Sequence, residues 1–242
     1  MATFVLIHGS WHGGWCVDAV KAVLEAAGHH VIAPDLPGMG GDDAALAAIT
    51  LQGWADFGAD LCRQAPSRPV VLAGHSRGGL VVSQTAETAP EAIDALVYIC
   101  AMMLPDGISR AEFKALEEPN PAFDGLITPT PGGHGTVITG SDPGAVFAQI
   151  SPPDAVAAAM ARLLSEPHGP RSEKLHLSAA RWGSLPRTYV ECTQDRTIPL
   201  SSQRRMQAMS PGAHVVTLDA DHSPFLSRPQ ELAQALIGAI PV

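Results

Sequence analysis

Residues 74–79 read Gly-His-Ser-Arg-Gly-Gly, between an apolar run that begins at Val70 and a helical pattern that extends to Ala89. The pattern Gly-x-Ser-x-Gly between a strand and a helix is typical of a sharp turn that exposes a nucleophilic serine. Glycines are needed because larger side chains beside the serine would collide, and the helix N-terminus behind it favours negative charge. The stretch lacks the lysine of a phosphate-binding loop. The sequence therefore predicts that Ser76 is a nucleophile.

The chain on both sides of this turn alternates short apolar runs with longer helical patterns. Each apolar run is nearly continuous, as in a parallel sheet that is covered on both faces. We therefore expect an α/β fold with about six strands, mainly parallel, and helices on both faces of the sheet. The expected strands are Thr3–His8, His30–Ala33, Val70–Gly74, Ala95–Cys100, Thr188–Cys192 and His214–Leu218. The expected helices are Trp15–Ala27, Leu51–Gln64, Gly78–Ala89, Ser201–Met209 and Pro229–Ile240.

Length and composition suit one globular domain over residues 1–242. Hydrophobic residues make up 46% of the chain and charged residues 16%, which excludes a disordered protein. The net charge is −9 and no run is rich in Lys or Arg, so neither nucleic acid nor a membrane surface is an expected partner. Four cysteines without a Cys-x-x-Cys pair predict reduced thiols in the cytoplasm. We expect no metal site and no cofactor.

The alternation of strands and helices breaks over about residues 104–184, which hold 10 of the 21 prolines. We expect this segment, called the cap below, to be an insertion that covers the sheet. Within it, Leu126–Thr128 and Thr136–Thr139 flank a glycine-rich stretch and predict a small hairpin. Further along, Ser151 is expected to cap the N-terminus of a helix that ends near Ser165.

A nucleophilic serine needs a base, and the base needs a carboxylate that holds its tautomer. His222 lies between the last expected strand and the last helix, in a loop at the carboxyl edge of the sheet. Asp195 directly follows the preceding strand. The chain order Ser76, Asp195, His222 matches the order typical of this strand–turn–helix context. For Asp35 we expect a structural role in its own loop, and Asp106 would serve only if the acid came one strand earlier.

The remaining parts of such a site are an oxyanion hole and a pocket. Ser10 follows the first strand, and its backbone N–H, with that of Arg77, is expected to bind the oxyanion. Trp11 and His12 are expected to line the mouth of the pocket. Two readings of the Arg77 side chain stay open. One is a salt bridge to the loop around Asp195, and the other is a cation near the pocket that favours an acidic substrate.

Together these motifs resemble the α/β-hydrolase superfamily, and more narrowly the plant methylesterase and hydroxynitrile-lyase group with its bacterial esterase relatives. The resemblance covers the whole chain apart from much of the cap. It implies six central parallel strands, a serine mechanism without a cofactor, and a mostly apolar pocket under a helical cap. The stretches that carry it are residues 4–15, 28–38, 74–79, 194–199 and 221–225.

Two departures from the lyases of that group bear on the reaction. Those lyases have threonine where this chain has Gly9, and lysine where Ser223 follows the histidine. The lysine supplies positive charge for a departing cyanide, so its absence favours ester hydrolysis. By position, we expect Gly9 and Ser223 to lie beside the substrate.

We therefore expect a serine hydrolase that cleaves small carboxylic esters through an acyl-enzyme, with a small-molecule ester as its partner. Three alternatives stay open: a hydroxynitrile lyase, a lactone-acting enzyme on the same three residues, and a small-ligand receptor on a hydrolase scaffold. They stay open because a fold does not fix a substrate. The sequence does not decide between a monomer and a homodimer, and both stay open.

Overall fold

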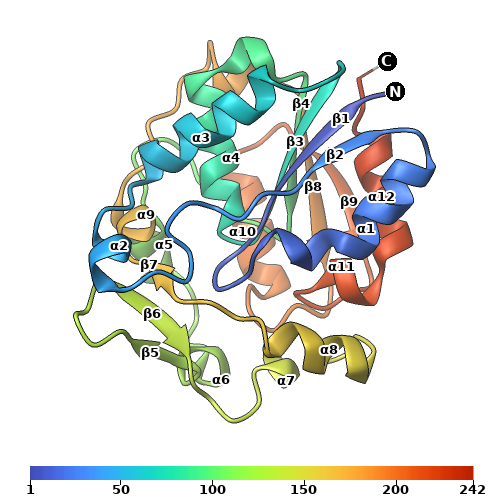
Figure 1. Ribbon diagram of the computed structural model, residues 1–242. Helices are drawn as coiled ribbons and strands as arrows, with labels where there is room; N and C mark the ends of the chain where they lie inside the picture. Colours follow the sequence, from blue (N-terminus) through green and yellow to red (C-terminus); the bar gives the residue numbers. More distant parts are fainter. Residues whose placement is uncertain (242) are drawn as a thin grey trace.

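The structure is a computed structural model that describes residues 1–241. Its centre is a six-stranded sheet in the order β2-β1-β3-β4-β8-β9, in which every neighbouring pair is parallel (Figure 1). The predicted sheet is thereby confirmed, and every strand boundary lies within one residue of its expected position. The strands are β1 (Thr3–Ile7), β2 (His30–Ile32), β3 (Val70–His75), β4 (Ala95–Ile99), β8 (Arg187–Cys192) and β9 (His214–Leu218).

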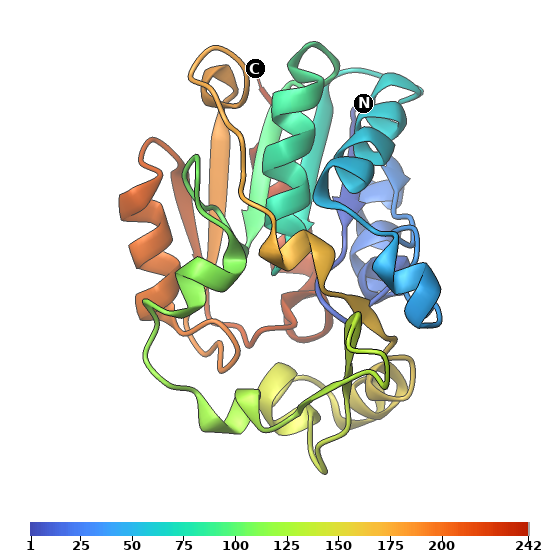
Figure 2. The same ribbon diagram turned by 90° about the vertical axis from the view of Figure 1, so that its left-hand side faces the viewer.

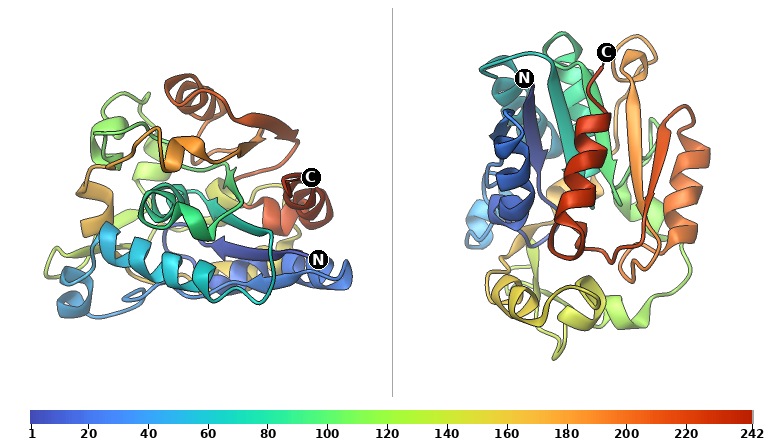
Figure 3. Two further views of the ribbon diagram at one scale, coloured as in Figure 1. Left: turned by 90° about the horizontal axis from the view of Figure 1, so that it is seen from above. Right: turned by 90° about the vertical axis from the view of Figure 1, so that its right-hand side faces the viewer.

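Helices cover both faces of this sheet, as predicted. On one face lie α1 (Asp18–Ala26), α11 (Pro224–Ser227) and α12 (Pro229–Gly238), which stand in front of the sheet in the right-hand view of Figure 3. On the other face lie α3 (Leu51–Arg63), α4 (Gly78–Thr88) and α10 (Leu200–Met209). The strands β1, β3 and β4 are buried along their whole length, because both faces pack against helices.

Two local features near the N-terminus differ from expectation. The helix predicted from Trp15 begins as a 3₁₀ turn, Gly14–Val17, and continues as α1. The short helix α2 (Asp43–Ala47) was not predicted, although Asp42 caps it by accepting a hydrogen bond from the backbone of Ala45. A second 3₁₀ turn, Pro90–Ala92, precedes β4 and a third, Trp182–Ser184, precedes β8.

Most of the cap lies beyond the carboxyl ends of the central strands, and Figure 2 shows its green to yellow elements gathered at that end of the sheet. Its last residues run back along α4 toward the start of β8. The predicted hairpin forms: β5 (Ile127–Pro129) pairs antiparallel with β6 (Gly135–Ile138). A third strand, β7 (Glu166–Pro167), pairs with β6 and was not predicted. The cap helices are α5 (Arg110–Lys114), α6 (Pro121–Asp124), α7 (Gly144–Phe147), α8 (Pro153–Met160) and α9 (Gly169–Ser172).

The cap helix predicted between Ser151 and Ser165 is shorter than expected. It is α8, its N-terminal cap position is Pro152, and it ends at Met160. Ser151 does not cap it, because the Ser151 hydroxyl donates a hydrogen bond to Asp221 in the loop after β9. Among residues 1–241, no helix has both the length and the apolar character needed to cross a membrane.

Candidate active site

Ser76 sits in a strained turn between β3 and α4. Its φ of 53° lies in the left-handed region, which a residue other than glycine seldom adopts. The neighbouring glycines make the turn sterically feasible. A Cβ at Gly74 would lie 2.6 Å from the backbone oxygen of Gly78, and one at Gly78 would lie 2.8 Å from the backbone oxygens of Ile7 and His8. The turn therefore requires glycine at positions 74 and 78, where any side chain would clash with the backbone.

The structure brings the three predicted residues Ser76, His222 and Asp195 into one hydrogen-bonded row. His222 Nε2 lies 3.1 Å from Ser76 Oγ, and His222 Nδ1 lies 2.7 Å from Asp195 Oδ2. All three residues are buried, with His222 2% exposed. An arrangement of this kind can take the proton from the serine hydroxyl while the carboxylate stabilises the imidazolium.

Asp195 is held by the turn that follows β8. Its Oδ1 accepts hydrogen bonds from the backbone N–H groups of Thr197 (2.7 Å) and Ile198 (2.8 Å). The side-chain amide of Gln203, from α10, lies 3.4 Å from Oδ2. These bonds fix the carboxylate plane, so the second oxygen is directed at His222. Asp35 and Asp106 lie elsewhere, where each accepts a hydrogen bond from a backbone N–H.

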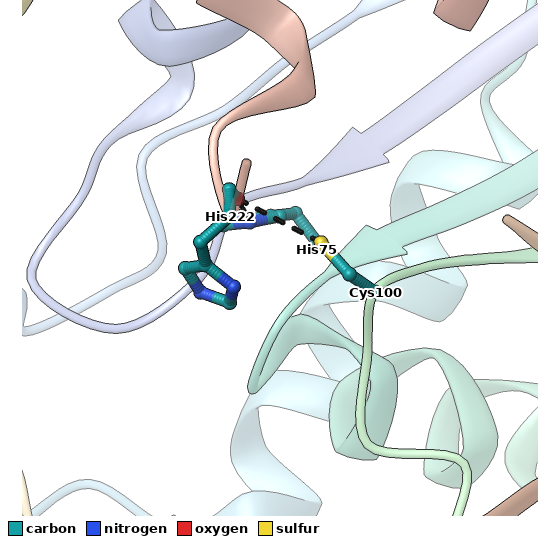
Figure 4. Close-up of side chains that lie close together, drawn as sticks. All are labelled: His75, Cys100 and His222. Atoms are coloured by element: carbon teal, nitrogen blue, oxygen red, sulfur yellow. Dashed lines mark hydrogen bonds between the residues drawn. The ribbon is translucent and has the colours of Figure 1, made fainter. Parts of the chain in front are cut away.

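The backbone of the His222 loop is supported by two buried side chains. In Figure 4, His75 and Cys100 both point at the carbonyl oxygen of His222. The Nε2–H of His75 donates to this oxygen at 2.7 Å, and the Cys100 thiol donates at 3.7 Å. Burial lowers the pKa of His75 well below its ordinary value, so the ring is neutral and its donor position stays defined.

His75, Cys100 and His222 also offer ligand atoms close enough together to hold a metal ion. Their chemistry suits hydrogen bonding better. His75 Nε2 is used by the carbonyl of His222, and both ring nitrogens of His222 face the other two residues of the row. Burial raises the pKa of the Cys100 thiol well above its ordinary value, so the thiolate that metals prefer is disfavoured.

The backbone N–H groups of Ser10 and Arg77 are the donors that the sequence predicts for the oxyanion. Both residues line the cavity above Ser76, one after β1 and the other after the serine itself. Over the described chain, neither N–H donates a hydrogen bond to another protein group. Two free donors beside a nucleophile are what a tetrahedral oxyanion requires.

The Arg77 side chain forms a buried ion pair, but its partner is not the loop around Asp195 as one expectation had it. Arg77 Nε lies 2.7 Å from Glu166 Oε1, in the cap strand β7, and the two side chains are 3% and 0% exposed. Arg77 also lies over the ring of Trp54, with Cζ 4.3 Å from the ring centroid. The same Glu166 accepts hydrogen bonds from Ser10 Oγ (2.9 Å) and from the backbone of Trp11 (3.1 Å).

The cavity above Ser76 has a volume of about 30 Å³, which exceeds the space of one water molecule but is far below that of an ordinary ligand pocket. The cavity is lined by Ser10, Trp11, His12, Ser76, Arg77, Met102, Arg110, Phe123, Phe147, Arg171, Thr197, Ile198 and His222.

Of the four residues expected beside the substrate, Trp11 and His12 line this cavity and Gly9 and Ser223 do not. Gly9 lies beneath it, where a Cβ would be 2.7 Å from His75 Nδ1 and 2.8 Å from Ser76 Cβ. Ser223 is fully buried behind His222. Burial lowers the pKa of His12 to about 4, so this ring is neutral near pH 7.

Sequence reasoning missed Asp221, which precedes His222. This carboxylate is fully buried and accepts hydrogen bonds from Ile150 and Ser151 of the cap, at 3.0 and 2.9 Å. It also accepts bonds from the backbone N–H of Ser223, just before α11, and from the hydroxyl of Ser227, at the end of α11. Asp221 therefore links the cap to the histidine loop. The only signal in the sequence was an acidic residue next to the proposed base.

Comparison with known proteins finds a family model and several curated sequences that match most of this chain. A family model described as "Alpha/beta hydrolase family" matches residues 4–235. A pyrethroid hydrolase of Sphingobium wenxiniae is 33% identical over 240 residues, which cover 96% of this chain and 85% of that protein. Salicylic acid-binding protein 2 of Nicotiana tabacum is 32% identical over 97% of this chain and 95% of its own length.

Solved structures of two ester-cleaving enzymes are also similar to this chain over nearly its whole length. The crystal structure of a pyrethroid hydrolase from Sphingobium faniae JZ-2 superposes with a TM-score of 0.87 at 30% identity, over 98% of this chain and 96% of that one. The crystal structure of polyneuridine aldehyde esterase gives 0.84 at 27% identity, over 98% of both chains.

Proposed function

The chain belongs to the alpha/beta hydrolase family and is a serine ester hydrolase, and from this we propose that Ser76, His222 and Asp195 carry out its reaction. The observation that supports these roles is the continuous row of hydrogen bonds from Ser76 Oγ through His222 to Asp195. Ser10 and Arg77 supply the oxyanion hole through their backbone N–H groups. The substrate is a small carboxylic ester.

The reaction proceeds in two halves. Ser76 Oγ attacks the ester carbonyl while His222 Nε2 takes the hydroxyl proton, and the tetrahedral oxyanion is held by the two N–H groups. His222 then gives its proton to the departing alcohol, which leaves an acyl group on Ser76. Water repeats the attack with His222 as base, and the acid is released with Ser76 restored. Asp195 stabilises the imidazolium in both halves.

Hydrolysis is favoured over cyanohydrin cleavage by the surroundings of His222. The position after this histidine is occupied by Ser223, which is neutral and fully buried, so it supplies no charge for a departing cyanide. A threonine at position 9 would meet both His75 and Ser76, because even a Cβ there comes within 2.8 Å of each. Both observations favour an esterase over a lyase at this site.

Hydrolysis of 4-nitrophenyl esters of rising chain length tests the proposal. Ser76→Ala is expected to lower kcat by on the order of 10⁴–10⁶, as loss of a triad member does in other serine hydrolases. Ser83→Ala, which removes a buried hydroxyl of α4 that is bonded to Tyr98 and does not line the cavity, is the matched control and keeps its activity. Full activity in Ser76→Ala would overturn the proposal.

We also place the protein in the cytoplasm. The support is that Cys16, Cys62, Cys100 and Cys192 are all free and buried, as is common for proteins in reducing compartments. For the oligomeric state, a homodimer is the alternative to a monomer. Sedimentation velocity separates the two.

A further inference from the structure

The cavity above Ser76 has an unusual charge. Its lining includes three guanidinium groups, those of Arg77, Arg110 and Arg171, and over residues 1–241 it includes no Asp or Glu. The whole chain carries a net charge of −9, so this local excess of positive charge runs against the overall composition. A buried cation needs a partner within the protein or an anion from outside it, and a half-buried cation such as Arg171 is open to an anion from solvent.

Two of the three arginines have carboxylate partners. Arg77 is paired with Glu166, as described above. Arg110 Nη2 lies 2.8 Å from Glu117 Oε2, and both side chains are more than nine-tenths buried. These two pairs are neutral overall. The excess positive charge of the cavity is therefore carried by Arg171.

The cationic groups near α5 and α9 still have unused hydrogen-bonding capacity. Arg110 Nη1 is buried without a hydrogen-bond partner. Within the part of the chain that the structure describes, Arg171 has no carboxylate within 4 Å and its side chain donates no hydrogen bond. The helices that carry the two residues pack against each other. Burial lowers the pKa of Arg110, Glu117 raises it, and the positive charge of Arg171 lowers it further.

We propose that Arg110 and Arg171 form an anion-binding subsite, and that the preferred substrate is an ester that also carries a carboxylate. This inference rests on the ester hydrolysis proposed above and names its substrate class. A carboxylate accepts two hydrogen bonds from guanidinium groups at once, so it would satisfy the free Arg110 Nη1 and neutralise Arg171. Trp11, Phe123 and Phe147 line the same cavity and would hold an aromatic body between the two ends of the substrate.

Two pairs of rigid esters test this subsite. In the first pair the charge is on the alcohol side, with 4-carboxyphenyl acetate against the neutral 4-carbamoylphenyl acetate. In the second pair it is on the acyl side, with monomethyl terephthalate against methyl 4-carbamoylbenzoate. The benzene ring keeps each carboxylate away from its own ester, so intramolecular attack does not contribute. We expect kcat/KM to be at least about tenfold higher for the anion in one pair, because charged hydrogen bonds contribute that much.

Arg171→Gln is the informative variant, because it removes the charge without breaking a buried ion pair. The ratio of kcat/KM for the anionic ester to that for its neutral partner is expected to fall about tenfold. Arg162→Gln is the matched control. It removes an exposed cap arginine that lies over Trp15 and does not line the cavity, so it leaves the ratio unchanged. Arg110 is unsuitable for this purpose, because its loss would leave Glu117 buried and uncompensated.

A binding measurement separates this inference from ester hydrolysis itself. Calorimetric titration of Ser76→Ala with the anionic ester of each pair, 4-carboxyphenyl acetate and monomethyl terephthalate, needs no turnover. The added Arg171→Gln change is expected to weaken binding of the preferred anion about tenfold. Turnover that depends on Ser76, with a ratio near one in both pairs, would overturn the subsite and leave the esterase standing. If neither anion bound more tightly than its neutral amide partner, the subsite would also be overturned, whether or not any ester is cleaved.

Discussion

Arg77 and Glu166 form a buried ion pair, with 2.7 Å between Nε and Oε1, that joins the turn of Ser76 to strand β7 of the cap. The same carboxylate holds the hydroxyl of Ser10 and the backbone of Trp11. One cap residue is therefore bonded to both segments that carry the proposed oxyanion donors. The position of the cap and the geometry beside the nucleophile are coupled through this pair.

Glu166→Gln is expected to lower the free energy of unfolding by on the order of 3–5 kcal/mol, because it leaves the Arg77 charge buried without compensation. The double variant Arg77→Met with Glu166→Gln should recover most of this loss, since neither charge remains. Urea denaturation followed by circular dichroism measures both. Arg63→Met breaks an exposed pair with Glu91 and should change the stability by less than about 1 kcal/mol. Equal stability of Glu166→Gln and the native protein would contradict the buried pair.

Asp221→Asn is expected to loosen the histidine loop from the cap. The amide nitrogen of asparagine replaces one carboxylate oxygen and cannot accept a hydrogen bond, so the bond from the backbone N–H of either Ile150 or Ser223 is lost. We expect a loss of about 1–3 kcal/mol in stability together with a lower kcat. Asp219→Asn, two positions earlier and exposed, is the matched control and should change neither. If both variants behaved alike, Asp221 would not hold the loop.

Acid should destabilise the protein through its buried histidines. Burial lowers the pKa of His12 from 6.5 to about 4 and that of His8 to about 3. Between pH 6.5 and 4 the unfolded chain binds protons at these residues and the folded chain does not, so stability falls as the pH is lowered through this window. For His12 the loss reaches on the order of 3 kcal/mol at pH 4.

The variant that isolates this effect is His12→Asn, whose side-chain amide can replace the Nδ1–H bond to the backbone of Ser10. Its stability should fall less steeply than that of the native protein between pH 6.5 and 4, as measured by denaturant midpoints at each pH. His214→Asn changes an exposed histidine and should follow the native curve. Parallel curves for the native protein and His12→Asn would show that His12 is charged in the folded state.

Parallel assays of ester cleavage and cyanide release distinguish an esterase from a hydroxynitrile lyase. The neutral, buried Ser223 supplies no electrostatic stabilisation for cyanide, so we expect hydrolysis of simple aryl esters and negligible cyanide release from mandelonitrile above the uncatalysed rate. A cyanide electrode and a phenol absorbance assay on the same sample measure the two. Faster release of cyanide than cleavage of any ester would contradict the argument from Ser223.

The sheet and the residues at its carboxyl edge could be predicted because local patterns determine them. Continuous apolar runs set the strands. Ser76 directly follows β3, Asp195 lies shortly after β8 and His222 shortly after β9, so a parallel sheet brings them to the same edge. The glycines beside Ser76 mark a turn whose steric demands are local as well. These features need no knowledge of how distant parts of the chain pack.

The cap contacts could not be predicted for the opposite reason. Glu166 lies in a strand of two residues, which is too short to leave a periodic pattern, and its partner Arg77 comes from another part of the chain. Ser151 looked like a helix cap because serine is common there, but its hydroxyl bonds to Asp221 across the molecule. Gly9 and Ser223 were placed beside the substrate by position in the chain, whereas close packing against His75 and Ser76, or behind His222, keeps them out of the cavity.

Covalent labelling with a fluorophosphonate, followed by peptide mass spectrometry, tests most directly whether Ser76 is the nucleophile. A fluorophosphonate reacts readily only with a serine that a neighbouring base activates. We predict one adduct per chain, on Ser76, which is absent in Ser76→Ala, strongly slowed in His222→Ala and retained in Ser223→Ala. Labelling of another serine in the native protein, or an adduct that persists in Ser76→Ala, would contradict the account.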